Sequence, residues 1–102
     1  MFELRPNCEL CDRDLPPAST EARICSYECT FCATCVDGVL RGVCPNCGGN
    51  FEPRPIRPAH AWREGTGLAH DPPGTRRRHT PYTREELEAF SATLRETASG
   101  ER

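Results

Sequence analysis

The sequence contains no lysine, and all 13 of its basic residues are arginine. It also lacks any apolar run close to the ~20 residues that a membrane-spanning helix needs, so no membrane segment is expected. Only 36% of its 102 residues are hydrophobic. A chain this short and this polar excludes a large enzyme barrel and a doubly wound nucleotide-binding domain, and it leaves room for one small domain at most.

Cysteine is absent from the second half of the chain, because all eight cysteines lie between Cys8 and Cys47. The first 24 residues are charged and interrupted by proline, without the apolar segment that an export signal needs. We therefore expect a cytoplasmic protein, in which thiols stay reduced and clustered cysteines bind metal. Four disulfide bonds are the alternative, although two cysteines with two residues between them form a disulfide with each other mainly in redox sites.

The spacing of the cysteines indicates metal binding. They form four close pairs in succession, which are Cys8/Cys11, Cys25/Cys29, Cys32/Cys35 and Cys44/Cys47. Two such pairs supply the four thiolates of one tetrahedral zinc site, so the eight cysteines predict two closed structural zinc ions. An iron–sulfur cluster is the alternative, but eight residues separate Cys35 from the Cys44-Pro45 that would end a ferredoxin run, where about three are expected.

The spacing alone leaves open which pairs share an ion. Sequential pairing joins the first pair with the second, whereas cross-brace pairing joins the first with the third. Only Thr30 and Phe31 separate Cys29 from Cys32. Side chains at an odd separation in a strand point to opposite faces, which sends Cys29 and Cys32 to different ions. Both pairings permit this.

The series of intervals resembles the RING-finger family, which closes on Cys-Pro-x-Cys as Cys44 to Cys47 do here. The segments ELRPNCELC, ICSYECTFCATCV, VCPNCGGNF and PRPIRP resemble, more narrowly, the bacterial family known as domain of unknown function 1272, over Met1 to about Pro58. The resemblance implies a RING-like zinc-binding module and supplies no established activity. It also implies cross-brace ligation, with one zinc on Cys8, Cys11, Cys32 and Cys35 and the other on Cys25, Cys29, Cys44 and Cys47.

The remaining pattern predicts a small metal-stabilised α+β fold with one short hairpin and one short helix. The hairpin is expected to join residues 22–24 to residues 29–31, and the helix to run from Thr34 to Arg41 with Gly42 past its end. The candidate core is small, so we expect the metal-free chain to be unfolded. Its members are Leu4, Leu10, Leu15, Ile24, Phe31, Val36, Val39, Leu40, Val43 and Phe51.

Three segments are expected: the zinc module over residues 1–52, a flexible linker rich in proline, arginine and glycine over 53–82, and an amphipathic helix over 83–98. The helix opens with a capping box at Thr83 and Glu86. Its apolar stripe either packs on the module or docks a partner or a second copy; the stripe comprises Leu87, Phe90 and Leu94.

The linker also carries one tryptophan and three histidines. Trp62 either packs back on the module or anchors a partner. The three histidines are expected to be bystanders, because eight cysteines suffice for two ions. They are His60, His70 and His79.

Charge and closed sites favour a non-enzymatic role without catalytic residues. Residues 1–52 hold four arginines against eight acidic residues, and eight thiolates with two divalent ions bring the loaded module to −8. Such an anionic module is a poor ligand for nucleic acid. We expect a zinc-binding interaction module that contacts a protein partner.

Two other functions stay open. Many eukaryotic RING domains are ubiquitin ligases, which bind a conjugating enzyme through apolar residues where Leu10 and Pro45 stand here, although Gly48 replaces the basic residue expected after the last cysteine. A nucleic-acid regulator would use the arginine run, whose alternative interpretation is a solvated basic stretch. The run comprises Arg76, Arg77 and Arg78.

Overall fold

A short antiparallel hairpin lies at the centre of the chain in the computed structural model, which describes residues 1–102. Its strands are β1 (Ala22–Ile24) and β2 (Thr30–Cys32), with Arg23 opposite Phe31. At the turn, Glu28 takes the left-handed conformation, with φ of 70°. This is the predicted hairpin, with its second strand starting one residue later than expected.

A third strand, β3 (Glu52–Pro53), was not predicted; it pairs with β1 and gives the strand order β2-β1-β3. Pro53 has no N–H to donate, which an edge strand tolerates. β3 spans the expected boundary between module and linker, and the pairing continues past it, since the Arg54 N–H donates to the Ala22 carbonyl over 3.0 Å. The sheet therefore includes the start of the linker.

The predicted short helix is present as two consecutive pieces. Helix α1 (Ala33–Cys35) follows β2 directly and continues into one turn of π-helix, η1 (Val36–Leu40). The helix ends where Arg41 and Gly42 take positive φ angles of 51° and 78°. Such left-handed residues are a common helix stop, and they turn the chain towards the last pair of cysteines.

The C-terminal helix α2 (Arg84–Leu94) begins at the predicted capping box. The Glu86 N–H donates to Thr83 Oγ1 over 3.2 Å, and the Thr83 N–H donates to Glu86 Oε1 over 3.0 Å. A short 3₁₀-helix, η2 (Ser99–Glu101), follows. The capping box supplies partners for two backbone donors that a helix N-terminus otherwise leaves free.

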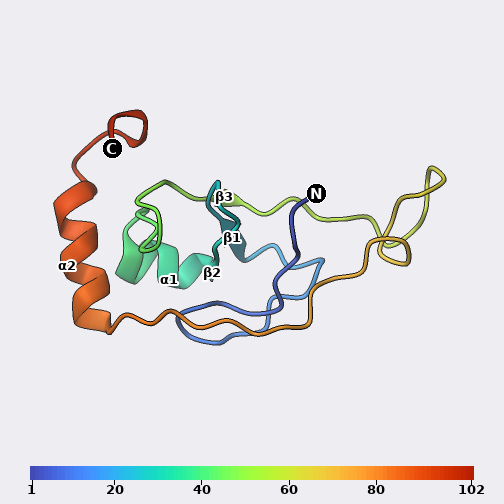
Figure 1. The fold of residues 1–102 in the computed structure, drawn as a ribbon, viewed down its shortest axis with the longest axis horizontal. Coiled ribbons are helices and arrows are strands. Elements are labelled where there is room, and N and C mark those ends of the chain that lie inside the picture. The colour runs from blue at the N-terminus through green and yellow to red at the C-terminus, as the bar shows by residue number, and fades with distance from the viewer.

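Helix α2 packs on η1 (Figure 1). Leu87 is 1% exposed within the core, and the Ser91 hydroxyl donates to the Leu40 carbonyl over 2.7 Å. Phe90, in contrast, keeps 39% of its surface exposed. Of the two interpretations of the apolar stripe, packing on the module therefore holds for Leu87.

Cysteine makes up a large part of the core. The buried cluster comprises 13 residues, six of which are cysteines. Phe31 is fully buried and meets Phe51 edge-to-face, with ring centroids 5.6 Å apart. Of the predicted core residues, seven are buried and three are half-buried; the half-buried ones are Leu10, Ile24 and Phe51.

The chain between β3 and α2 runs to the far end of the molecule, turns there and returns along the N-terminal segment (Figure 1). This path gives an elongated shape with extents of 46 × 27 × 18 Å. Trp62 lies on this excursion, 77% exposed, with its ring against that of His60. The flexibility expected for the linker stays a prediction. No helix in the structure has the length and apolar character to span a bilayer.

Candidate metal centre

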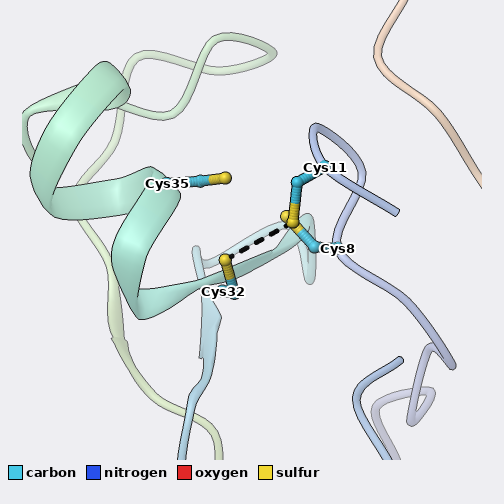
Figure 2. A group of neighbouring side chains, drawn as sticks. All are labelled: Cys8, Cys11, Cys32 and Cys35. Carbon is cyan, nitrogen blue, oxygen red and sulfur yellow. Dashed lines mark hydrogen bonds between the residues drawn. The ribbon is translucent and has the colours of Figure 1, made fainter. Parts of the chain in front are cut away.

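Four cysteine side chains from two distant parts of the chain point towards one another (Figure 2). Cys8 and Cys11 come from the N-terminal loop, Cys32 from the end of β2 and Cys35 from α1. Because α1 follows β2 without a loop, one strand-to-helix junction positions both Cys32 and Cys35. The four sulfurs all lie within 4.8 Å of one another.

The spacing of these sulfurs fits a tetrahedral metal ion. With zinc–sulfur bonds of about 2.3 Å, the sulfurs of a tetrahedral site lie roughly 3.8 Å apart. The Cys11 and Cys32 sulfurs are 3.7 Å apart. The donor set is also that of a structural zinc site, since it consists of four thiols and no other ligand type.

A second group of sulfurs forms at the hairpin turn. Cys25, at the hairpin turn, lies within 4.8 Å of Cys44 and Cys47. Cys29 is buried next to this group, where its thiol interacts with those of Cys25 and Cys44, but its sulfur lies beyond 4.8 Å from at least one of the three. The structure thus assembles three of the four predicted cysteines and places Cys29 beside them.

The grouping is the cross-brace. The first pair of cysteines lies with the third. Cys25 of the second pair lies with the fourth pair, and Cys29 lies beside them. The fold class that the RING resemblance implied is therefore confirmed, and sequential pairing is excluded as its geometry. Neither group includes a histidine.

The first and last Cys-x-x-Cys knuckles, Cys8–Cys11 and Cys44–Cys47, are built alike. After Cys11, the Asp12 N–H donates to the Cys8 carbonyl over 2.9 Å; after Cys47, the Gly48 N–H donates to the Cys44 carbonyl over 2.7 Å. Asp12 and Gly48 both take left-handed conformations, with φ of 64° and 79°. The left-handed residue closes each knuckle and directs both of its sulfurs to one side.

Crowding of the thiols splits their pKa values within each group. Contacts with the thiols of Cys29 and Cys44 lower the pKa of Cys25 to about 3. The hydrogen bond to Cys25 raises the pKa of Cys44, because the second thiol must ionise beside a thiolate. In the first group, burial and the contact with Cys32 raise the pKa of Cys35. A divalent cation removes this penalty, since it binds thiolates and releases their protons.

Glu9, a residue that sequence reasoning missed, links the two groups. It stands between the ligand positions of the first knuckle, and its Oε2 accepts from the Thr30 N–H over 2.7 Å and from Arg5 over 3.1 Å. Its Oε1 accepts from Asn46, in the last knuckle, over 3.5 Å. An isolated acidic residue between two cysteines has no sequence signal for this role.

Arg54 is a second residue without a sequence signal. It is 4% exposed, and its guanidinium donates to the carbonyls of Arg5, Leu15 and Pro16 over 2.9–3.0 Å. Burial, followed by the nearby charge of Arg57, lowers the pKa of Arg54. These bonds hold the N-terminal loop against the sheet, and with it the first pair of cysteines.

The structure separates the three members of the arginine run. Arg77 pairs with Asp12 and Asp14, and Arg78 pairs with Glu3 over 3.3 Å. Arg76 is exposed, and its guanidinium has no hydrogen bond or ion pair. Two of the three guanidinium groups are thus neutralised within the chain. The solvated-stretch interpretation fits Arg76 alone.

The histidines and the knuckle residues Leu10 and Pro45 take no part in the sulfur groups. His79 contacts Asp12, with Nε2 to Oδ1 at 3.0 Å, and hydrogen bonds from Arg77 and then His79 lower the pKa of Asp12. Leu10 is half-buried against the core, and Pro45 is buried.

Residues 1–57 match the model of a family described as protein of unknown function, DUF1272. The chain belongs to this family. It is also 64% identical over 59 residues to an uncharacterized protein of Rhizobium meliloti (strain 1021), a stretch that covers 58% of this chain and 70% of the relative. No solved structure matches the chain. The match contains both cysteine groups and β3, which identifies the cross-braced module as the part shared within DUF1272.

Proposed function

We propose that this DUF1272 protein binds two zinc ions, each through four thiolates, and that the ions serve a structural purpose. The observation that carries the proposal is the meeting of four sulfurs within 4.8 Å around one point. Site one comprises Cys8, Cys11, Cys32 and Cys35, and site two comprises Cys25, Cys29, Cys44 and Cys47. In site two, a small movement of Cys29 completes the set. Bound zinc would supply a cross-link between the N-terminal loop and the strand-to-helix junction in site one, and between the hairpin turn and the last knuckle in site two.

The role we propose is that of a non-enzymatic interaction module in the cytoplasm, which contacts a protein. Each proposed site fills all four tetrahedral positions with thiolates, so no position is left for a substrate or an activated water. A reducing compartment keeps such thiols available for metal. The loaded module, at −8, repels phosphate, and two arginines of the basic run are already paired with carboxylates. These features favour a protein partner over a nucleic acid.

Native mass spectrometry of the full chain, purified under reducing conditions, tests the metal assignment. We expect two zinc ions per chain. Cys11→Ser should lose the ion of site one, because Cys11 supplies one of its four ligands, while Ser26→Ala, at the exposed hairpin turn, should keep both. Iron in place of zinc, or a single ion in the unmodified chain, would contradict the proposal.

A further inference from the structure

The arginine run lies along the first knuckle, although the two segments are far apart in the sequence. Gly74 donates from its N–H to the Leu4 carbonyl over 2.9 Å, and Thr80 donates to the Glu9 carbonyl over 2.7 Å. The returning segment follows the N-terminal loop in Figure 1. The tail, which we define as residues 58–102, therefore packs along the N-terminal loop that carries the first knuckle.

Two residues flank the first knuckle, and both are bound by the tail. Asn7, immediately before Cys8, is fully buried; its Nδ2 donates to the Arg78 carbonyl over 2.8 Å and its Oδ1 accepts from the Arg78 N–H over 3.2 Å. The same Nδ2 donates to Asp12 Oδ1 over 3.0 Å. A buried amide with its polar atoms satisfied has one preferred arrangement, so Asn7 fixes the tail and the knuckle relative to each other.

Arg77 binds Asp12, the residue that closes this knuckle. Its Nε and Nη2 donate to Asp12 Oδ1 over 3.0 and 2.8 Å, and its Nη2 also donates to the Asp12 carbonyl over 2.6 Å. Its Nη1 donates to Asp14 over 2.7 Å. One planar guanidinium thus binds both the side chain and the backbone of the left-handed residue after Cys11, a geometry that lysine cannot reproduce.

The knuckle of site two is held in a similar way. The Arg102 Nη1 donates to the carbonyl of Gly48, the left-handed residue after Cys47, over 3.1 Å, and to the Gly42 carbonyl over 3.3 Å. Leu94 of α2 lies so close to Gly48 that a Cβ built there would be 3.2 Å from its Cδ1. In both knuckles, a tail arginine donates to the carbonyl of the closing residue.

We propose that Arg77 and Arg102 are positioning residues, each of which holds the turn that closes one metal site and thereby slows loss of its ion. The inference rests on the proposed function, because it concerns the retention of the same two ions. A thiolate leaves zinc when its knuckle opens, and opening requires the left-handed residue to move. The arginine bonds oppose that movement. By linkage, an ion that orders the knuckle also strengthens docking of the tail.

Charge supports this assignment. Residues 53–102 carry nine arginines against seven acidic residues, whereas the loaded module, residues 1–52, carries −8. Attraction between them needs no external partner, and Arg77 faces Asp12 and Asp14 directly. Arg77 and Asp12 are 39% and 50% exposed, so salt weakens their pair. Of the arginine run, Arg77 and Arg78 are thus accounted for by contacts within the chain.

Zinc transfer from the full chain to a chromogenic chelator, combined with hydrogen exchange at single amides, tests the inference. Arg77→Ala should release one of the two ions about three- to tenfold faster, because it removes a network of charge-assisted bonds. The Asp12 amide should exchange faster in the same variant. Arg102→Ala should accelerate release of the other ion and hydrogen exchange at the Gly48 amide.

Arg76→Ala is the matched control, since it removes the same charge from the same segment without removing a side-chain contact. It should leave both release rates unchanged. Arg77→Lys, which keeps the charge and loses the fork, should fall between the wild type and Arg77→Ala, and it carries the test if Arg77→Ala does not fold. If Arg77→Ala and Arg102→Ala each bind two ions and release them at the wild-type rates, the proposed role of the two arginines is wrong. It is also wrong if Arg76→Ala accelerates release as much as Arg77→Ala does. Fewer than two ions in the wild type would instead overturn the proposed function.

Discussion

At the scale of single residues, the position after each knuckle carries the greatest conformational constraint. Asp12 occupies it in the first knuckle, where four hydrogen bonds to its side chain favour the left-handed conformation. Gly48 occupies it in the last knuckle, where a Cβ would lie only 3.2 Å from the Leu94 Cδ1. The two knuckles therefore reach one backbone geometry by different means: a satisfied aspartate in one, and the absence of a Cβ in the other.

Gly48→Ala is therefore expected to destabilise the protein. Its φ of 79° costs an alanine about 1–2 kcal/mol, and the contact with Leu94 adds to that cost. Chemical denaturation of the zinc-loaded protein measures the change. Gly38→Ala is the control, because a Cβ there meets nothing within 4 Å; it should be neutral or stabilising by roughly 0.5–1 kcal/mol. Equal effects of the two substitutions would contradict the constraint at Gly48.

The sequence predicted residues whose partners are near in the chain or share a spacing. The cysteine pairs and the capping box at Thr83 belong to this class, because each is defined within a few positions. Asn7 and Arg77 do not, since their partners lie 71 and 65 positions away. No local pattern encodes such contacts, which exist only once the tail has returned along the N-terminal loop.

At the scale of elements, the hairpin and both helices followed from local pattern, whereas β3 did not. Two residues, one of them proline, give no period to detect. β3 forms because β1 already presents a free edge, so its cause lies in tertiary structure. The same holds for α2, whose stripe predicted a helix and left open what it packs on.

Leu87→Ala tests whether α2 is part of the fold. Leu87 is 1% exposed against η1, and truncating such a side chain costs about 2–5 kcal/mol. We expect the amides of α2 to lose protection in hydrogen exchange, while the strands keep theirs. Glu88→Ala, at the next and exposed position, should change stability by no more than about 0.5 kcal/mol. Unaltered protection of α2 in Leu87→Ala would show that the helix is held by other contacts.

At the scale of the whole molecule, the two proposed ions would do work that a larger apolar core does in other proteins. Six of the 13 clustered core residues are cysteines, so the centre of the protein consists largely of thiols that repel one another when ionised. The three strands have at most three residues each, too few to be stable alone. Two proposed metal cross-links would account for both the low apolar content and the short elements.

Removal of metal should therefore unfold the chain. A strong chelator under reducing conditions is expected to abolish the near-ultraviolet circular dichroism and to collapse the dispersion of amide resonances, because the proposed ions supply folding free energy. Zinc added back should restore both signals. The tail should lose its order together with the module, since Asn7 and Arg77 tie the two together. A chelated protein that retained its near-ultraviolet signal would show that the apolar residues alone suffice, and the cysteine groups would then serve a purpose other than stability.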